Sequence, residues 1–160
     1  MAKQKPPVTQ AVRQLRQMKV AFTHHPYTYV DGGGTAQFAK ELDVDEHLVI
    51  KTLIMEDEKG NPLIVLMHGN CEVSTKALAR QIGVKTVSPC APNVADKHSG
   101  YQVGGTSPFG TKRKMPIYCE ASILELETLY INGGKRGYII SMPARELARV
   151  LNPVTIQAIQ

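Results

Sequence analysis

A single lysine interrupts the most apolar stretch of the chain. Lys51 stands inside residues 49–55, where alternation along a strand puts it on one face with Val49 and Leu53 and leaves an apolar second face. Two apolar faces are typical of a strand in the middle of a sheet. A lysine there needs an anionic partner or a cavity, so Lys51 is a candidate for binding an anionic substrate. The alternative is an edge strand on which Lys51 extends into solvent.

Residues 100–110 form a loop that is too rich in glycine to be a strand. At its centre, Gly104 and Gly105 allow backbone amides to point into one concavity, which can hold a phosphate or a developing oxyanion. Thr111 and Lys112 stand in the reverse of the order that a Walker A loop requires, so that motif is excluded. The alternative is a plain tight turn.

A second glycine-rich segment, residues 132–137, lies between two predicted strands. The cations beside the two loops are Lys112, Arg113, Lys114, Lys135 and Arg136. Basic side chains next to glycine backbone suit ligands that carry phosphate. We expect the two loops to frame one pocket. The alternatives are a hairpin turn and ordinary solvated charge.

The composition is that of one ordinary globular domain. The chain has 160 residues, 42% of them hydrophobic, with 19 Lys and Arg against 14 Asp and Glu. Its net charge of +5 is concentrated in the second half, which carries +4. No apolar stretch approaches the roughly 20 residues of a membrane helix, and no secretory signal is visible, so we expect a cytoplasmic protein without membrane contact.

The usual signatures of metal sites and protein nucleophiles are absent from the sequence. Cys71, Cys90 and Cys119 are widely spaced, and the five histidines form no ligand pattern, so we expect no disulfide framework, metal or cofactor. There is also no G-x-S-x-G elbow and no local carboxylate pair. If the protein is an enzyme, binding, positioning and backbone donors must do much of the catalysis.

Helices and strands are predicted to alternate over one domain, residues 1–160. Predicted helices cover residues 8–18, 35–42, 74–82 and 92–98 and a segment after Pro143, with Thr35 and Ser74 as expected caps. Predicted strands cover residues 25–30, 49–55, 63–67, 84–87, 115–119, 128–131 and 138–141. Both hairpin-like and crossover-like connections occur, so the fold class is α/β (mixed α+β) with a mixed sheet.

Three of these motifs occur together in a known family. The sequence resembles the YbaK/EbsC family in the order and separation of three segments, residues 49–53, 100–110 and 133–137. Members of this family are free-standing relatives of the editing domain inserted in bacterial prolyl-tRNA synthetases. The resemblance covers nearly the whole chain. It implies a compact fold with a mixed, barrel-like sheet surrounded by helices. It also implies removal of a wrong amino acid from charged tRNA, with aminoacyl-tRNA as partner and prolyl-tRNA synthetase as a second one.

The resemblance also implies roles for individual residues. Lys51 matches the family's essential strand lysine in the acceptor-end pocket, and Gly104 and Gly105 match the loop whose backbone faces the ester carbonyl. The predicted substrate-binding residues are Tyr27, Thr52, Thr106, Ser107, Asn132, Gly133, Gly134 and Ile139. The five cations beside the loops are predicted to bind tRNA.

In cysteine-specific members of that family, the substrate's own thiol attacks its ester carbonyl, so no protein nucleophile is required. This chain departs from their pattern at Asn132, where they have Ser, and at Ile139, where they have Asp. Residues 32–34 also lack the aromatic of such members. These differences favour tRNA deacylation in general over cysteine in particular.

The predicted function is therefore a trans-acting aminoacyl-tRNA deacylase, with Cys-tRNA(Pro) as first substrate. One alternative is a deacylase of the same fold that uses water on Ser-, Thr-, Ala- or 2-aminobutyrate-tRNA. Others are a non-catalytic module that binds tRNA or a synthetase, and a small-molecule-binding domain without a nucleic-acid partner.

Overall fold

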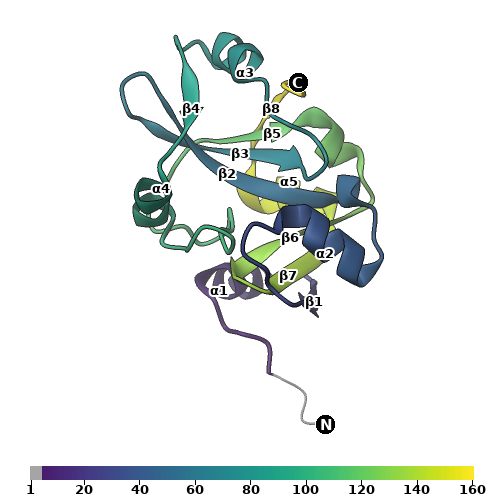
Figure 1. Cartoon of the computed structure of the whole chain (residues 1–160). Coiled ribbons are helices and arrows are strands. Elements are labelled where there is room, and N and C mark those ends of the chain that lie inside the picture. The colour runs from purple at the N-terminus through teal and green to yellow at the C-terminus, as the bar shows by residue number, and fades with distance from the viewer. Residues whose placement is uncertain (1–4) are drawn as a thin grey trace.

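The computed structural model describes residues 5–160, so residues 1–4 of the predicted domain lie outside the described residues (Figure 1). The helices are α1 (Gln10–Gln17), α2 (Gly34–Leu42), α3 (Thr75–Ile82), α4 (Pro92–Ser99) and α5 (Ala144–Leu151), with 3-10 turns η1 (Glu46–Leu48) and η2 (Ala121–Glu125). The strands are β1 (Thr23–Pro26), β2 (Val49–Asp57), β3 (Pro62–His68), β4 (Val87–Pro89), β5 (Ile117–Glu120), β6 (Thr128–Lys135), β7 (Tyr138–Pro143) and β8 (Val154–Ile156). The predicted mixed α/β class is confirmed.

The strands form one mixed sheet in the order β1-β7-β6-β2-β3-β5-β8, with β4 attached to β2. The predicted hairpin of β2 and β3 is present and antiparallel. Pairs β2–β6, β3–β5 and β5–β8 are parallel. Within residues 5–160 the order ends at β1 and β8 and does not close on itself.

Strand β2 is shared between two neighbours along one of its edges. Strand β3 pairs along the other edge from Ile50 to Glu56. On the shared edge, β6 pairs with Val49 and Ile50, whereas β4 pairs only from Met55 onward. We call the intervening part of β2, residues 51–54, the fork. Figure 1 shows β4 rising away from β2 while β6 and β7 lie below it, with α4 and the following loop beside the opening.

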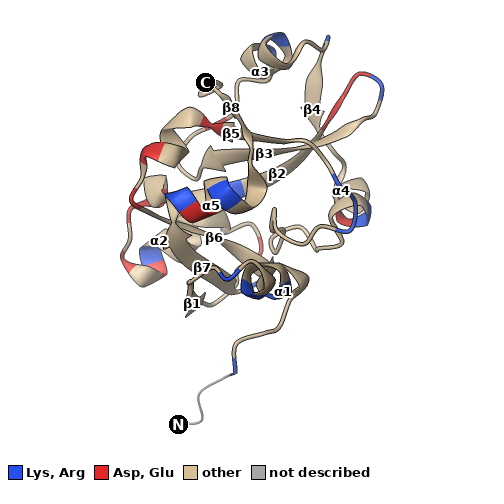
Figure 2. Cartoon of the chain, turned by 180° about the vertical axis from the view of Figure 1, so that it is seen from behind, with Lys and Arg blue, Asp and Glu red and all other residues tan. Residues whose placement is uncertain are grey.

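Three apolar clusters hold the helices against the sheet. The largest contains Leu15 of α1 and Leu147 of α5, and these helices lie on one face of β6 and β7 (Figure 2). A second cluster joins Leu78 of α3 to β2, β3 and β8. The third joins Phe38 of α2 to Val49 on the other face of the sheet. Both faces of β2 are therefore covered, as its apolar sequence predicts.

The two expected helix caps have different outcomes. Ser74 caps α3, because its hydroxyl accepts a hydrogen bond from the N–H of Ala77 at 3.2 Å. The expected cap at Thr35 is wrong: Gly33 is the N-cap of α2. The Thr35 hydroxyl instead donates to the Glu46 carboxylate at 2.7 Å and ties α2 to η1.

Other differences concern the ends of elements. Val8 and Met18, the two ends of the predicted helix over residues 8–18, lie outside α1 and are exposed, because Thr9 caps α1 and the helix covers only Gln10–Gln17. Strand β1 begins and ends before the predicted one, β4 comes later than predicted, and β8 was missed. None of the helices in residues 5–160 has the length and apolarity needed to span a membrane.

Candidate functional site

Lys51 lies at the fork, in the interior of the sheet. Because β2 has β3 on one side and β6 and β4 on the other, the edge-strand alternative for Lys51 is wrong. Its side chain is only 20% exposed, and its ammonium lies 3.5 Å from Oε1 of Glu72. Glu72 follows β3 in the chain and is 82% exposed. Lys51 thus has an anionic partner that an incoming ligand can replace.

Three of the predicted binding residues share the sheet face of Lys51. Lys51 and Asn132 each directly follow the last pair of β2 and β6, Ile50 with Ile131, and alternation puts both on the face of Val49. Ile139, which pairs with Asn132, belongs to the apolar cluster on that face and is 5% exposed. Tyr27 packs against the same cluster. This face therefore combines an ammonium, an amide and an apolar wall.

The two glycine-rich loops lie against one another beside Asn132. The Asn132 Nδ2 donates to the carbonyl of Gly104 at 3.2 Å, and its Oδ1 accepts from the N–H of Gly134 at 2.7 Å. A Cβ added at Gly105 would lie only 2.6 Å from the backbone N of Arg136. The Nε of Arg136 donates to the carbonyl of Val103 at 2.9 Å. Asn132 and Arg136 therefore fix the position of the first loop on the second.

The backbone amides of the first loop are not equivalent. The N–H of Gly105 donates to the carbonyl of Gln102 at 2.7 Å and closes a turn. Gly104 has φ +92°, a conformation that favours glycine, and residues 5–160 provide no acceptor for its N–H. Of the two predicted glycines, Gly104 is therefore the one that can donate to a substrate oxygen.

The hydroxyls predicted to bind substrate lie in different surroundings. Ser107 is fully buried, and its hydroxyl accepts from the N–H of Phe109 at 3.2 Å. The Thr106 hydroxyl donates to the carbonyl of Gln102 at 3.4 Å. Thr52 lies at the fork on the face opposite Lys51, and its buried Oγ1 has no partner among the described residues. Ser107 thus has a structural partner, whereas the Thr52 hydroxyl is unpaired.

Gly133 and Gly134 hold the bulged end of β6 against its neighbours. The Thr9 hydroxyl donates to the carbonyl of Gly133 at 2.5 Å. A Cβ at Gly133 would meet the Tyr138 ring at 2.5 Å, and one at Gly134 would meet the Tyr101 ring at 2.8 Å. Both glycines permit close packing around the loop contact.

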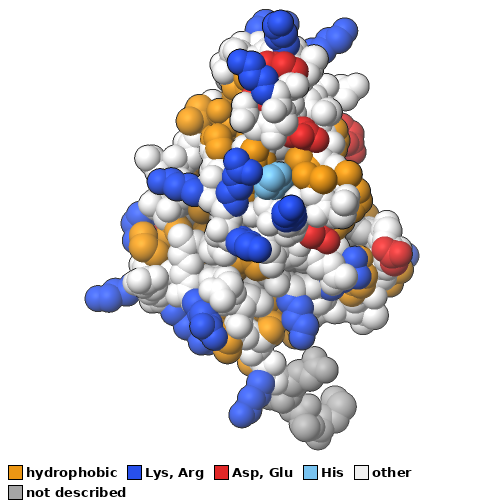
Figure 3. All heavy atoms as spheres, turned by 90° about the vertical axis from the view of Figure 1, so that its left-hand side faces the viewer, with side chains coloured by type: hydrophobic (Ala, Val, Ile, Leu, Met, Phe, Trp, Pro, Cys, Tyr) orange, Lys and Arg blue, Asp and Glu red, His pale blue; other side chains and the backbone are white. Residues whose placement is uncertain are grey.

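The remaining predicted cations border the first loop at its far end. The N–H groups of Lys112 and Arg113 donate to the carbonyls of Ser99 and His98, which places residues 112–114 beside the end of α4. Arg113 and Lys114 are exposed. Figure 3 views the molecule from the side where α4 and this loop lie, and Lys and Arg side chains are spread over that face around one histidine. Cations thus flank the glycine loop at both ends.

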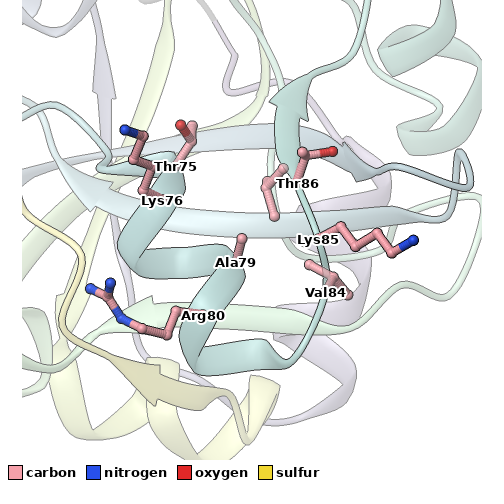
Figure 4. Close-up of a pocket in the computed structure, with 8 residues that line it drawn as sticks. Thr75, Lys76, Ala79, Arg80, Val84, Lys85 and Thr86 are labelled. Atoms are coloured by element: carbon pink, nitrogen blue, oxygen red, sulfur yellow. The ribbon is translucent and has the colours of Figure 1, made fainter.

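A separate hollow contains none of the predicted site residues. It lies between α3 and β4, has a volume of about 470 Å³, and is bordered by Lys76, Arg80 and Lys85 (Figure 4). Ala79, Val84 and Val87 give it an apolar part of its lining. It is therefore a second basic region, distinct from the fork.

The protein's own thiols differ in accessibility. Burial raises the pKa of the Cys119 thiol to about 12 and also raises the pKa of Cys90. Cys71 is only half-buried and directly precedes Glu72. The described residues contain no group of three or more His, Cys, Asp or Glu arranged to hold a metal ion.

One further residue at the site, Glu72, has no signal in the sequence, and another, Tyr29, has an ambiguous one. Glu72 is 21 positions from Lys51 and meets it only because the β2–β3 hairpin returns the chain. Tyr29 borders Gly104, and the Arg136 guanidinium lies over the Tyr29 ring, 4.9 Å from its centroid. Its ring is half-buried. In the sequence of residues 24–29, Tyr29 is a candidate for stacking on a base or lining a pocket, with a place in the core as the alternative.

Comparison with known proteins relates this chain to tRNA editing. Residues 31–150 match the family model of the aminoacyl-tRNA editing domain. The chain is 28% identical over 145 residues to the "Putative Cys-tRNA(Pro)/Cys-tRNA(Cys) deacylase EbsC" of Enterococcus faecalis, covering 90% of this chain and 88% of that one. It is 35% identical over 95 residues to the proline–tRNA ligase of Thermodesulfovibrio yellowstonii, covering 59% of this chain and 16% of the ligase.

Solved structures share the fold. The hypothetical protein APE2540 superposes with a TM-score of 0.86 at 20% identity, covering 94% of this chain and 99% of that one. A "putative trans-editing enzyme for prolyl tRNA synthetase" superposes with a TM-score of 0.81 at 16% identity, covering 94% and 95%. The family predicted from the three motifs is confirmed, and the chain belongs to the aminoacyl-tRNA editing domain family.

Proposed function

We propose that this protein is a trans-acting deacylase that clears mischarged tRNA, with Cys-tRNA(Pro) as its leading substrate. Membership of the editing family supports deacylation of aminoacyl-tRNA. The name of its EbsC relative supports cysteine. The observation that carries the proposal is the position of Lys51, which is mostly buried at the fork, one residue past the last β2–β6 pair. The residue at the same point of β6, Asn132, donates to Gly104 of the glycine loop, whose own N–H is available.

The geometry supports a division of roles without a protein nucleophile. When the tRNA binds, the Lys51 ammonium leaves Glu72 and contacts the acceptor end, which it holds by its charge. The substrate thiol attacks its own ester carbonyl, forming a C–S bond while the N–H of Gly104 stabilises the oxyanion. The C–O bond then breaks, and the thiol proton ends on the 3′-hydroxyl of the tRNA. The products are a thiolactone and free tRNA.

A second candidate substrate class has support in the pocket itself. Asn132 and the buried Ile139 stand where cysteine-type relatives have a hydroxyl and a carboxylate, and the amide of Asn132 is engaged by Gly104 and Gly134. An apolar wall at residue 139 suits a small side chain such as that of alanine or 2-aminobutyrate. Water would then replace the thiol as attacking group.

The test is a panel of tRNA(Pro) charged with Cys, Ala, Ser, Thr or 2-aminobutyrate, each incubated with the protein. Thiolactone from Cys-tRNA(Pro) is the expected product. Lys51→Ala should lower the rate at least about 100-fold, a loss of roughly 3 kcal/mol of transition-state stabilisation. Lys59→Ala, in the exposed β2–β3 turn, is the matched control.

Two results would contradict the proposal. Full activity of a folded Lys51→Ala variant would remove the assigned role of the lysine. If wild-type protein binds tRNA with a steep salt dependence and deacylates none of the panel, the chain is a non-catalytic binding module.

A further inference from the structure

A groove of about 820 Å³ runs beside the β6–β7 turn. Its walls come from three segments: residues 5–7 before α1, residues 24–29 in and after β1, and residues 135–138 at the turn. We call it the tyrosine groove. Lys51 does not line it, and neither does any residue of the hollow between α3 and β4.

The lining of the tyrosine groove combines flat rings with positive charge. Tyr27 and Tyr29 contribute half-buried rings, and Lys5 and Lys135 contribute exposed ammonium groups. No carboxylate is among its described lining residues. Two lie beside it: Asp31 accepts a hydrogen bond from the Tyr29 hydroxyl at 3.5 Å, and Glu41 accepts one from the N–H of Thr28 at 2.8 Å. Aromatic rings that stack on bases, together with cations along the backbone, are the features that bind single-stranded nucleic acid.

The groove is continuous with the candidate site. Arg136 lines it, places its guanidinium over the Tyr29 ring at 4.9 Å and donates to the carbonyl of Val103 in the glycine loop. A Cβ on Gly104 would lie 2.8 Å from the Tyr29 hydroxyl. A strand lying in the groove therefore ends at the loop that contains the candidate oxyanion donor.

We infer that the tyrosine groove binds the single-stranded nucleotides that precede the terminal adenosine of the tRNA. Their bases lie against Tyr27 and Tyr29, and their phosphates face Lys5 and Lys135. The inference rests on the proposed function for the identity of this strand, and it adds a binding site outside the fork. It gives the protein a means of holding the tRNA end that does not depend on the attached amino acid.

The test is an NMR titration of the full chain with the uncharged tetranucleotide 5′-ACCA-3′. Amide shifts are expected in residues 24–29 and 135–138, which line the groove. The variant Lys5→Ala/Lys135→Ala should lower the slope of log K against log salt by about 1.4, because two phosphate contacts are lost. A tetranucleotide with abasic sugars should bind at least about fivefold more weakly, because stacking is lost.

The matched control removes two lysines from the other hollow. Lys76→Ala/Lys85→Ala changes the net charge equally and should leave the affinity and the salt slope for 5′-ACCA-3′ unchanged. The spectrum of each variant reports whether it is folded.

Three outcomes would overturn the inference: shifts outside the groove, an unchanged salt slope in Lys5→Ala/Lys135→Ala, or equal shifts with a poly-glutamate peptide. Deacylation by wild-type protein is measured separately on charged tRNA. Deacylation without binding of 5′-ACCA-3′ in the groove rejects the groove alone. Binding in the groove without deacylation of any charged tRNA rejects the enzyme alone.

Discussion

At residue 139, the side chain that faces the candidate pocket is also part of the core. Ile139 packs with Phe38, Ala39 and Val49 and is 5% exposed. Replacing it with the aspartate of cysteine-type relatives would bury a carboxylate among apolar groups. A change of specificity through this position therefore has to overcome a loss of stability.

We predict that Ile139→Asp lowers the free energy of unfolding by about 3 kcal/mol or more, through lost apolar burial and an unpaired acid. Urea denaturation followed by circular dichroism measures the change. Ile139→Val, which removes one methyl group, should cost only about 1 kcal/mol. If Ile139→Asp is as stable as wild type, the carboxylate has a partner or solvent access that the fold does not show. Asn132→Ser alone is then the cleaner test of substrate choice.

His68 couples the fold to pH. It is fully buried, with Nδ1 at 2.6 Å from the carbonyl of His47 and Nε2 at 2.7 Å from the Ser122 hydroxyl. Burial lowers its pKa, so the folded protein holds the neutral ring, with Nδ1–H donating and Nε2 accepting. The unfolded chain binds a proton near pH 6.5 that the folded chain does not.

The free energy of unfolding should therefore fall as pH drops below about 6.5, because the unfolded state gains the proton first. His24 and His25, whose pKa values burial also lowers, act in the same direction. Urea denaturation at several pH values between about 5 and 8 measures the slope. His68→Gln should make the free energy of unfolding depend less steeply on pH. If the variant and the wild type show the same dependence, His68 is not a source of it.

Among elements, the glycine loop depends on the bulged end of β6. The loop contacts the bulged end of β6 through Gly105, where a Cβ would lie 2.6 Å from the N of Arg136 and 2.8 Å from the C of Lys135. Both atoms belong to the backbone, so no flexible side chain can move aside.

We predict that Gly105→Ala destabilises the protein by roughly 1–3 kcal/mol and also lowers deacylation, because it forces the loop away from β6. Thermal denaturation and the charged-tRNA assay measure the two effects. Thr106→Ala, next in the chain and without an added atom, should retain wild-type stability within about 0.5 kcal/mol. If Gly105→Ala loses stability but keeps its activity, the contact between the loop and β6 is not needed for deacylation.

The elements also show what the sequence can predict. The β2–β3 hairpin and α3 were predictable because local signals agree: apolar alternation, a turn sequence, a Ser74 cap and a final Gly83. The fork was not, because it arises when β6, far along the chain, pairs with only the first two residues of β2. Short β8 has only three residues, two of them exposed, and so little pattern to detect. Lys51 was predictable because a lysine is unusual in an apolar strand. Its partner Glu72 was not, because the two residues meet only through the β2–β3 hairpin.

For the whole molecule, part of the positive charge is gathered on both sides of the glycine loop. Residues 112–114 lie beside α4, and Lys135 and Arg136 lie at the β6–β7 turn, with the glycine loop between the two groups. Charge on this side should attract the duplex part of the tRNA, because binding of a polyanion releases counterions.

We predict that replacing Lys112, Arg113 and Lys114 with alanine weakens tRNA binding and lowers its salt slope by up to about 2.7, if each residue contacts one duplex phosphate. Filter binding at several salt concentrations measures both. The matched control replaces Lys76, Arg80 and Lys85, which removes the same charge from the hollow between α3 and β4. Equal losses in both variants would mean that the protein attracts tRNA by net charge rather than by this surface.

The unequal burial of the three thiols gives the molecule a built-in point for chemical labelling. Cys90 and Cys119 are buried with raised pKa values and should resist alkylation at neutral pH, whereas Cys71 is half-buried. Cys71 is covalently adjacent to Glu72, the carboxylate that pairs with Lys51. An environment-sensitive dye attached there would report, without any mutation, when the Lys51–Glu72 pair separates as substrate enters.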